Sequence, residues 1–203
     1  MNKLGILLSG RGSNFEAIAA AVREGRVEAE IAVVISNKPA APGLARAKEL
    51  GIPAESIPSK GTRRDEYDRR VASRLKEYGV DLVCLAGFMR LLSAGFVEEF
   101  PERIVNIHPS LLPAFPGLDA QAQALEHGVR YAGCTVHFVD EQLDSGPIIA
   151  QAVVPVLEGD DEHALSARIL KEEHRIYPEA IQTIVSGDYR IVGRRVFGGR
   201  VAS

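Results

Sequence analysis

The sequence predicts an α/β fold, a mostly parallel β-sheet with helices on both faces and an antiparallel strand pair in the C-terminal half. Apolar runs of strand length alternate with helical patterns through the first half of the chain. These runs are apolar at nearly every position, as in strands that are buried on both faces. Two later runs are joined by only a few residues, and so short a connection suits antiparallel strands. We therefore expect the first half to be Rossmann-like.

The first half supplies four strands and four helices in alternation. Strands are expected over the apolar runs at residues 3–9, 30–36, 81–87 and 103–107. Helical patterns cover residues 14–24, 42–50, 64–78 and 93–100. Ser13 is followed three residues later by Glu16, which is the capping-box pattern and predicts that the first helix begins at Asn14.

The second half has a different order of elements. A proline-rich loop after residue 108 leads to a short helix at 120–127 and then to strands at 134–139 and 147–156. A long helix is expected at 162–185, followed by a stretch of strand character at 189–197. Since no linker or repeat interrupts the chain, we expect a single domain over residues 1–203.

Composition places the chain among ordinary globular proteins. Of its 203 residues 46% are hydrophobic and 25% are charged, which disfavours disordered and membrane-spanning classes. The 24 basic and 27 acidic residues leave no overall charge that would attract nucleic acid or an anionic membrane. The first apolar run is too short for a signal peptide, so we expect a cytoplasmic protein. Cys84 and Cys134 lie in apolar runs without metal-site spacing and are expected to be reduced and packed.

The stretch LLSGRGSNFEAI joins the first strand to the first helix through a glycine-rich turn. Gly10 and Gly12 would let backbone amides and the helix dipole converge on one point, as in phosphate sites. An ordinary strand-to-helix turn explains these residues equally well. A dinucleotide site fits poorly, because Phe15 replaces the third glycine of GxGxxG and the second strand ends in Ser36 and Asn37 without a ribose-binding acid. A phosphomonoester fits better.

Asn106 and His108 open the stretch NIHPSLLPAFPG at the end of a predicted strand. They are two apart on an extended segment, so their side chains leave the same face. Pro109, Pro113 and Pro116 stiffen the loop that follows. Open parallel sheets bind ligands beyond the carboxyl ends of their strands. An amide and an imidazolium held there would stabilise negative charge on a carbonyl oxygen, although a hydrogen-bonded structural pair is the alternative.

Three carboxylates occupy the predicted turn VDEQLDSGP, at Asp140, Glu141 and Asp144. Most acidic turns are solvated and have no further role. Asp144 is of interest only if it approaches His108, because a nearby carboxylate favours the charged imidazole.

Glu173 falls on the apolar stripe of the long helix. That stripe is formed by Leu165, Ile169, Ile176, Ala180 and Ile184 at spacings of three and four. A carboxylate that faces a core needs a partner. The partner would be an arginine of the protein or the ammonium group of a ligand.

These four stretches, with LAGFMRLLS and HPSLLPAFPG, closely resemble the glycinamide ribonucleotide formyltransferases, which use 10-formyltetrahydrofolate in purine synthesis. The similarity runs from Lys3 to about Gly187. The pattern Asn-x-His-Pro-Ser-Leu-Leu-Pro is specific to formyl-tetrahydrofolate enzymes as a group. The resemblance implies a cytoplasmic formyltransferase, monomeric or homodimeric, that acts on small molecules and needs no metal, nucleic acid or membrane.

The resemblance also assigns roles to single residues. Asn106, His108 and Asp144 would form the catalytic triad. Gly12, Ser13 and Asn14 would hold the phosphate of the ribonucleotide and Glu173 its amine, and Arg11 and Phe15 would also contact this substrate. The folate would contact Arg64, Met89, Arg90, Leu91, Leu92, Asn106, Asp140 and Asp144. The phosphate-binding half would cover about 1–100, the catalytic and folate-binding half about 101–187, and a tail 188–203.

Two features depart from the resemblance. Asp119 and Gln121 stand where relatives carry histidine, and the tail after Gly187 is poorly matched.

Three other functions share part of this pattern. A methionyl-tRNA formyltransferase would be expected to carry a further C-terminal domain for tRNA and a more basic chain. A formyltetrahydrofolate hydrolase would be expected to carry a regulatory domain before the first strand. A non-catalytic nucleotide-binding module would share the glycine-rich turn but would not need Asn106, His108 and Asp144 together.

Overall fold

The computed structural model describes residues 1–198 and divides into two compact units, Met1–Asn106 and Ile107–Ser203. The expected α/β class is confirmed: the strands are mostly parallel, one long pair is antiparallel, and helices surround them. The single domain over 1–203 stays a prediction. Residues 199–203 of the tail lie outside the described residues.

The first unit is a parallel sheet with its helices packed against it. Its strands are β1 (Asn2–Leu8), β2 (Ala29–Ser36), β3 (Ala54–Ser56), β4 (Leu82–Leu85) and β5 (Ile104–His108), in the order β3-β2-β1-β4-β5. Its helices are α1 (Ser13–Arg23), α2 (Pro42–Glu49), α3 (Arg64–Glu77) and α4 (Ala94–Glu99). Strand β3 was not expected from the sequence, because it is three residues long and lies between prolines.

The core of this unit follows from the apolar strands. Leu4, Ile6, Leu7 and Leu8 of β1 are fully buried, so both faces of the central strand are covered. The carboxyl ends of the parallel strands meet at one edge of the sheet, where the turn after β1 and the end of β5 emerge. This arrangement places the glycine-rich turn and Asn106 at the ligand-binding edge typical of such sheets.

Helix α1 begins one residue earlier than predicted, and its capping box does not form. The N-cap is Gly12, in the left-handed conformation at φ 82, and no side chain caps the helix. Glu16 instead accepts a hydrogen bond from Arg46 at 3.2 Å. The prediction was wrong because a glycine with positive φ turned the chain into the helix before Ser13 could take the capping position.

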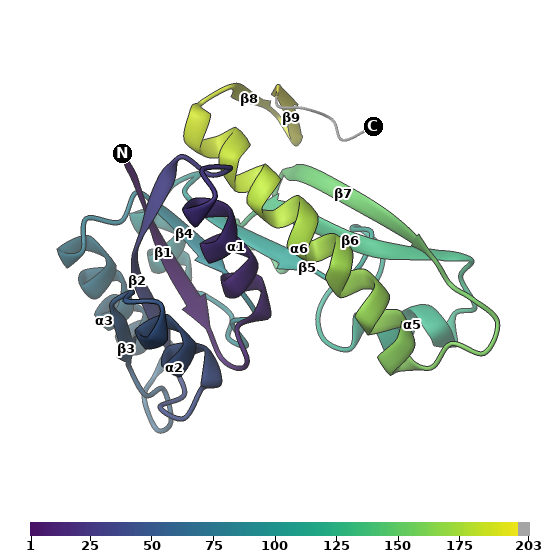
Figure 1. Ribbon diagram of the computed structural model, residues 1–203, viewed down its shortest axis with the longest axis horizontal. Coiled ribbons are helices and arrows are strands. Elements are labelled where there is room, and N and C mark those ends of the chain that lie inside the picture. The colour runs from purple at the N-terminus through teal and green to yellow at the C-terminus, as the bar shows by residue number, and fades with distance from the viewer. Residues whose placement is uncertain (199–203) are drawn as a thin grey trace. The chain divides into compact units, whose positions relative to one another are not determined.

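The second unit combines an antiparallel hairpin, a long helix and a small terminal hairpin. Its elements are α5 (Ala120–Glu126), β6 (Tyr131–Phe138), β7 (Ile148–Pro155), α6 (Glu162–Ser186), β8 (Tyr189–Val192) and β9 (Arg195–Gly198). Strands β6 and β7 are antiparallel, as expected from their short connection. Helix α6 packs along both of them (Figure 1).

Helix α6 matches its sequence signals closely. The Asp161 side chain accepts from Ala164 N at 2.7 Å and caps its start, and Gly187 at φ 71 ends it. The predicted apolar stripe is buried, and Glu173 on that stripe is only 7% exposed. Two cysteines, Cys84 and Cys134, are free and buried, as predicted.

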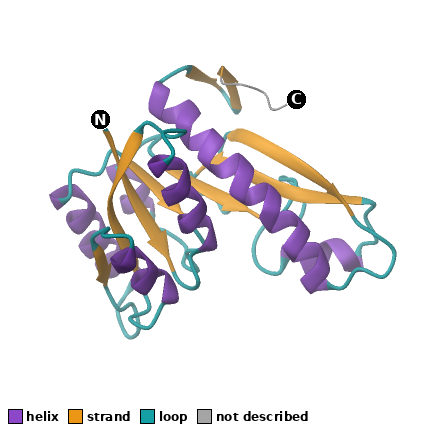
Figure 2. Cartoon of the chain, viewed as in Figure 1, coloured by secondary structure: helices purple, strands orange, loops and turns teal. Residues whose placement is uncertain are grey.

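The last stretch of strand character forms two strands rather than one. Gly193, at φ 61, reverses the chain between β8 and β9, which pair antiparallel (Figure 2). Strand β9 also pairs in parallel with β7. Over the part of the chain that the structure describes, no helix combines the length and apolar character that a bilayer span requires.

Strand β6 begins at Tyr131, three residues before the predicted start. The predicted strand was too short because Gly133 weakens the strand pattern in the sequence. A Cβ at this position would lie 2.0 Å from the Ala152 carbonyl oxygen of β7. Glycine weakens a strand pattern in a sequence, but here it permits close approach of two backbones.

We predict that Gly133→Ala lowers the free energy of unfolding by about 1–3 kcal/mol or more, because the backbones of β6 and β7 must separate. Gly95→Ala is the matched control: a Cβ there meets nothing within 4 Å, and alanine in helix α4 should leave stability unchanged or raise it by up to about 1 kcal/mol. Urea denaturation of both variants measures the difference. Equal stability of the two variants would contradict the close approach.

Candidate active site

The end of β5 places an amide and an imidazole two residues apart. Asn106 is half-buried and His108 is 4% exposed. Both belong to one strand, in which alternate side chains leave the same face. The predicted position of this pair at a strand end is therefore confirmed.

The loop after β5 fixes the His108 ring. His108 Nε2 lies 2.8 Å from the Phe115 carbonyl oxygen. Phe115 has a positive φ of 51, a conformation that costs a non-glycine residue about 1–3 kcal/mol. Within the loop, the Ser110 hydroxyl donates to Ala114 O at 2.5 Å. The loop thus turns back on itself and presents a carbonyl to the imidazole.

Thr135 ties this loop to the β6–β7 hairpin. Its buried hydroxyl donates to Ser110 O at 2.7 Å and accepts from Leu112 N at 3.1 Å. Gln151 of β7 donates to the same hydroxyl and to Leu112 O, at 3.0 Å each. These bonds hold the middle of the loop, so they fix the segment that carries Phe115.

The Asp144 carboxylate lies between two imidazoles. Its Oδ2 is 3.4 Å from His108 Nδ1 and its Oδ1 is 3.7 Å from His137 Nε2. Gly117 N donates to Oδ2 at 2.8 Å, so the far end of the proline-rich loop also closes on this carboxylate. The side chain is 9% exposed. Asp144 and His108, 36 residues apart in the chain, are therefore brought together as predicted.

The surroundings of the two imidazoles differ. Both His108 nitrogens face acceptors, Phe115 O and Asp144 Oδ2. For His137, burial is the largest effect and lowers the pKa, while the Phe138 carbonyl and the Asp144 charge act in the opposite direction. Its Nδ1 lies 2.8 Å from Phe138 O. The Asp144 carboxylate therefore lies between one imidazole with an acceptor near each nitrogen and one whose charged form is disfavoured by burial.

The glycine-rich turn forms the start of α1 in the first unit. Gly10 O accepts from Gly43 N at 3.2 Å, and a Cβ on Gly12 would lie 3.1 Å from Gly43 Cα. The N–H groups of Ser13, Asn14 and Phe15 are in the first turn of the helix, where backbone donors have no carbonyl within the helix. Arg11 is exposed, whereas the Phe15 side chain is fully buried, so only the backbone of Phe15 is available to a ligand.

The predicted folate-contacting residues of the first unit include two large exposed apolar side chains. Met89 is 64% exposed and Leu91 is 55% exposed. Ser9 anchors this segment, since its hydroxyl donates to Asn37 Oδ1 at 2.6 Å and accepts from Met89 N at 2.8 Å. Exposed apolar side chains on an anchored segment are suited to contact a flat apolar ligand.

Arg90 of the same segment contacts helix α3. The Arg90 guanidinium lies 4.5 Å from the centre of the buried Tyr67 ring. Burial raises the pKa of Tyr67 to about 12, so its hydroxyl stays neutral. Arg64 is exposed at the start of α3, and Leu92 is half-buried. The neighbouring Ser93 N donates to the buried Asp68 carboxylate at 2.6 Å and fixes the end of the segment.

The turn that carries Asp144 is narrow at its neck and open at its tip. Phe138 N donates to Pro147 O at 2.9 Å, and a Cβ on Gly146 would lie 1.9 Å from Phe138 O. Asp140 Oδ1 accepts from Gln142 N at 2.9 Å. Asp144 itself has a left-handed φ of 48. Backbone strain of this kind persists where surrounding contacts hold it.

Glu173 is buried on α6 of the second unit, where α6 packs on β6. Burial raises the pKa of Cys134 to about 12, and the nearby Glu173 charge contributes to that shift. The Cys134 thiol of β6 therefore stays protonated, and the Glu173 carboxylate lies on the face of α6 that contacts the sheet.

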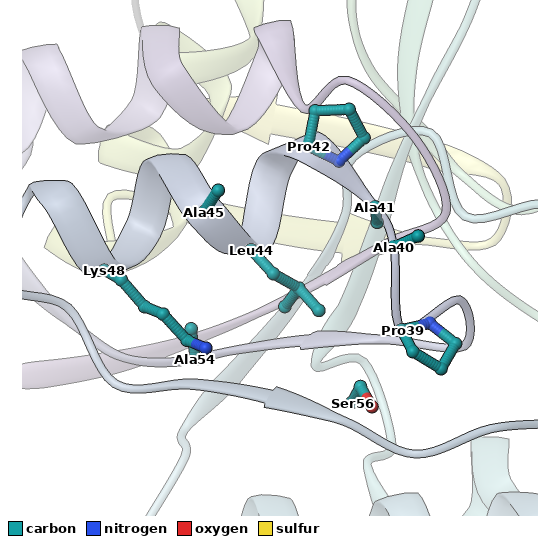
Figure 3. Close-up of a pocket in the computed structure, with 9 residues that line it drawn as sticks. All are labelled: Pro39, Ala40, Ala41, Pro42, Leu44, Ala45, Lys48, Ala54 and Ser56. Carbon is teal, nitrogen blue, oxygen red and sulfur yellow. The ribbon is translucent and has the colours of Figure 1, made fainter.

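A hollow of about 350 Å³ lies between α2 and β3 (Figure 3). It is lined by Pro39, Ala40, Ala41, Pro42, Leu44, Ala45, Lys48, Ala54 and Ser56. None of the predicted site residues lines it. Within residues 1–198, no group of three or more His, Cys, Asp or Glu side chains is arranged to hold a metal ion.

Sequence reasoning missed three residues that shape these sites. His137, Thr135 and Ser9 all lie in or directly after strands, where the sequence suggests only core positions. A polar residue inside an otherwise apolar run was the available signal, since a buried polar group must have a partner.

The formyl transferase family matches residues 2–181. The phosphoribosylglycinamide formyltransferase of Escherichia coli (strain K12) is 45% identical over 183 residues, which are 90% of this chain and 86% of that protein. Glycinamide ribonucleotide transformylase 1 from Symbiobacterium toebii has a crystal structure that is similar with a TM-score of 0.96, at 55% identity over 98% of this chain and 95% of that one.

Some relatives are much longer. The trifunctional purine biosynthetic protein adenosine-3 of Drosophila melanogaster is 51% identical over 188 residues, which are 91% of this chain. The chain spans only 14% of the length of that relative.

We predict that His137 titrates with a midpoint below 6.5, its ordinary value, because burial penalises the charged ring. Above pH 6.5 the ring is mostly neutral in both the folded and the unfolded chain, so burial of His137 does not lower the free energy of unfolding. As the pH falls below 6.5, the unfolded chain takes up this proton first, and stability declines. NMR of the imidazole carbons, assigned with His137→Gln, measures the midpoint. A midpoint at or above 6.5 would contradict the lowering of the His137 pKa by burial.

Proposed function

The chain belongs to the formyl transferase family, and from this premise we propose that it transfers the formyl group of 10-formyltetrahydrofolate to the amine of N1-(5-phosphoribosyl)glycinamide. The products are the formylglycinamide ribonucleotide and tetrahydrofolate, in de novo purine biosynthesis. The match to the E. coli enzyme along most of both chains supports this substrate pair. The observation that carries the proposal is the buried Asp144 carboxylate 3.4 Å from the His108 ring at a strand end.

The ribonucleotide has two charged ends, and the chain offers a group suited to each. Gly12, Ser13 and Asn14, with Arg11 and the Phe15 amide, would bind the phosphate, because helix N-termini favour anions. Glu173 would accept the ammonium group before it loses its proton. A carboxylate held on a buried helix face is suited to bind an ammonium group, because hydrogen bonds between charged groups are among the stronger ones.

The folate would be bound by the segment around Met89 and by the turn around Asp140. Met89, Leu91 and Leu92 supply apolar contacts, and Arg64 and Arg90 supply positive charge for the carboxylates of the folate tail. Asp140 and Asp144 offer acceptors in the turn of the second unit. Asn106 would donate to the formyl oxygen.

The reaction itself would be an addition followed by an elimination. The amine nitrogen attacks the formyl carbon, and the carbon–oxygen double bond opens to an oxyanion. The bond from the carbon to N10 of the folate then breaks, N10 receives the proton that the amine has lost, and the carbonyl re-forms. No covalent bond to the protein is required. Holding both substrates in place would supply much of the acceleration, since effective molarities can reach about 10⁵ M.

The oxyanion would be stabilised by Asn106 and by His108 Nδ1–H. The Nε2 side of the ring is held by Phe115 O at 2.8 Å. The Nδ1 contact with Asp144 is 3.4 Å, longer than an ordinary N–H···O hydrogen bond. Nδ1–H is therefore held less tightly than Nε2–H, and it would be the donor that reaches the oxyanion. Asp144 would support the ring through its charge and would pass the proton from the amine through a water molecule.

The remaining properties are expected from the sequence and not from the geometry of the site. A cytoplasmic location, a monomeric or homodimeric state and the absence of nucleic-acid and membrane partners stay predictions. Size-exclusion chromatography with light scattering decides the oligomeric state.

The function is tested by following tetrahydrofolate release from 10-formyltetrahydrofolate, with and without the ribonucleotide. We expect release only when the ribonucleotide is present. Release without it would point to a hydrolase instead. No release under either condition would favour a nucleotide-binding module and would contradict the proposal.

We predict that Asp144→Asn lowers kcat by at least about a hundredfold, because it removes the charge that supports the His108 imidazolium. Asparagine still accepts the Gly117 hydrogen bond and tolerates a left-handed φ, so the melting temperature should change little. Glu158→Gln, an exposed carboxylate after β7, is the control. Full activity of the Asp144 variant would remove this residue from the mechanism.

We predict that Glu173→Gln raises KM for the ribonucleotide about tenfold or more, because a hydrogen bond to a charged group is worth roughly 1.5–3 kcal/mol. KM for the folate should not change. The control is Glu179→Gln, an exposed carboxylate further along α6. Steady-state kinetics with each substrate varied in turn measures both constants. An unchanged ribonucleotide KM and turnover would show that Glu173 does not receive the amine.

A further inference from the structure

The terminal hairpin β8–β9 lies beyond residue 181, where the match to the family ends. It packs against both ends of the turn that carries Asp144. Arg195 of β9 pairs with Ile148, the first residue of β7, and the Tyr189 ring lies 5.7 Å from the ring of Phe138, the last residue of β6. The hairpin is therefore attached to the two strands from which the turn projects.

One side chain of the hairpin contacts the turn directly. The Arg194 guanidinium donates through Nη2 to the Ser145 carbonyl oxygen and lies 3.4 Å, through Nη1, from the Ser145 hydroxyl. Ser145 is the residue after Asp144, so this contact fixes the peptide unit next to the carboxylate. Hydrogen bonds from a charged donor are among the stronger ones.

The turn needs such a contact because it has few of its own. Glu141, Gln142 and Leu143 at its tip are exposed. Beyond the neck at Phe138 and Pro147, its internal bonds are Gln142 N to Asp140 Oδ1 and a long contact of 3.4 Å between the Ser145 hydroxyl and Gln142 Oε1. Asp144 is nevertheless held at a left-handed φ of 48 with its carboxylate against His108.

Arg194 differs from its neighbours in the hairpin. The guanidinium groups of Arg190 and Arg195 lie over the Phe197 ring, at 5.1 and 4.8 Å from its centre, and so remain within the hairpin. Arg194 is an exposed residue that reaches outside the hairpin to a backbone carbonyl. An exposed arginine contributes little to overall stability, so its contact matters mainly for the local position of the turn.

We propose that Arg194 is a positioning residue that holds the Asp140–Asp144 turn in the conformation that binds folate and places Asp144 against His108. The proposal rests on the proposed function, because it concerns the same turn. The terminal hairpin thereby has a part in catalysis. Strand β9 of the hairpin pairs with β7, and Arg194 contacts Ser145, the residue next to the catalytic carboxylate.

The test compares steady-state kinetics of Arg194→Ala with the wild type. Loss of the contact should let the turn move. We expect KM for the folate to rise and kcat/KM for the folate to fall on the order of tenfold, a typical effect for one charge-assisted hydrogen bond. KM for the ribonucleotide and the melting temperature should stay as in the wild type. Arg194→Lys keeps the charge and one donor and should recover part of the loss.

Arg190→Ala is the matched control, because it removes an exposed arginine from the same hairpin without touching the turn. It should behave as the wild type. If Arg194→Ala also behaves as the wild type, the proposal is wrong. A fall in kcat with both KM values unchanged and a lower melting temperature would also overturn it, because that pattern indicates loss of folded protein. An inactive wild type would instead contradict the proposed function, so the two failures are distinguishable.

Discussion

The carboxylate of Asp144 is shared by two buried imidazoles, and the arrangement of the candidate site depends on this contact. His108 Nδ1 and His137 Nε2 approach its two oxygens at 3.4 and 3.7 Å. A single negative charge in a buried site stabilises one positive ring well, and a second would be repelled by the first. His108 has an acceptor near each of its ring nitrogens. His137 is the ring whose pKa is lowered by burial.

Two loops must close on this carboxylate for the arrangement to exist. The loop at 109–117 contributes Phe115 O to His108 and Gly117 N to Asp144. The turn at 139–147 contributes Asp144 itself. Phe115 and Asp144 both have positive φ. Thr135 and Gln151 hold the loop, while Gly146 and Arg194 hold the turn. Backbone strain at these two positions persists because the surrounding contacts hold it.

Much of this molecule could be predicted from the sequence, and the limits have physical causes. Buried strands are visible as continuous apolar runs because both of their faces are covered, and the stripe of α6 is visible because burial along one face leaves a helical period in the sequence. Strand β3 is too short to show such a period. The capping box at Ser13 failed because Gly12 took the N-cap position through a positive φ. A polar residue in an apolar run marks His137 as needing a partner, but the partners of His137 and Arg194 could not be predicted, since they depend on how a strand end and a hairpin meet one turn. The roles of the site residues stay predictions.

The most direct test of the account is a double-mutant cycle on kcat/KM with His108→Asn, Asp144→Asn and the double variant, each checked for an unchanged fold. If the carboxylate acts only through the imidazolium, the losses are not additive, and the double variant should lose about as much as the more damaging single variant. If the two losses multiply in the double variant, Asp144 and His108 act independently, and the shared charge is not the basis of the site.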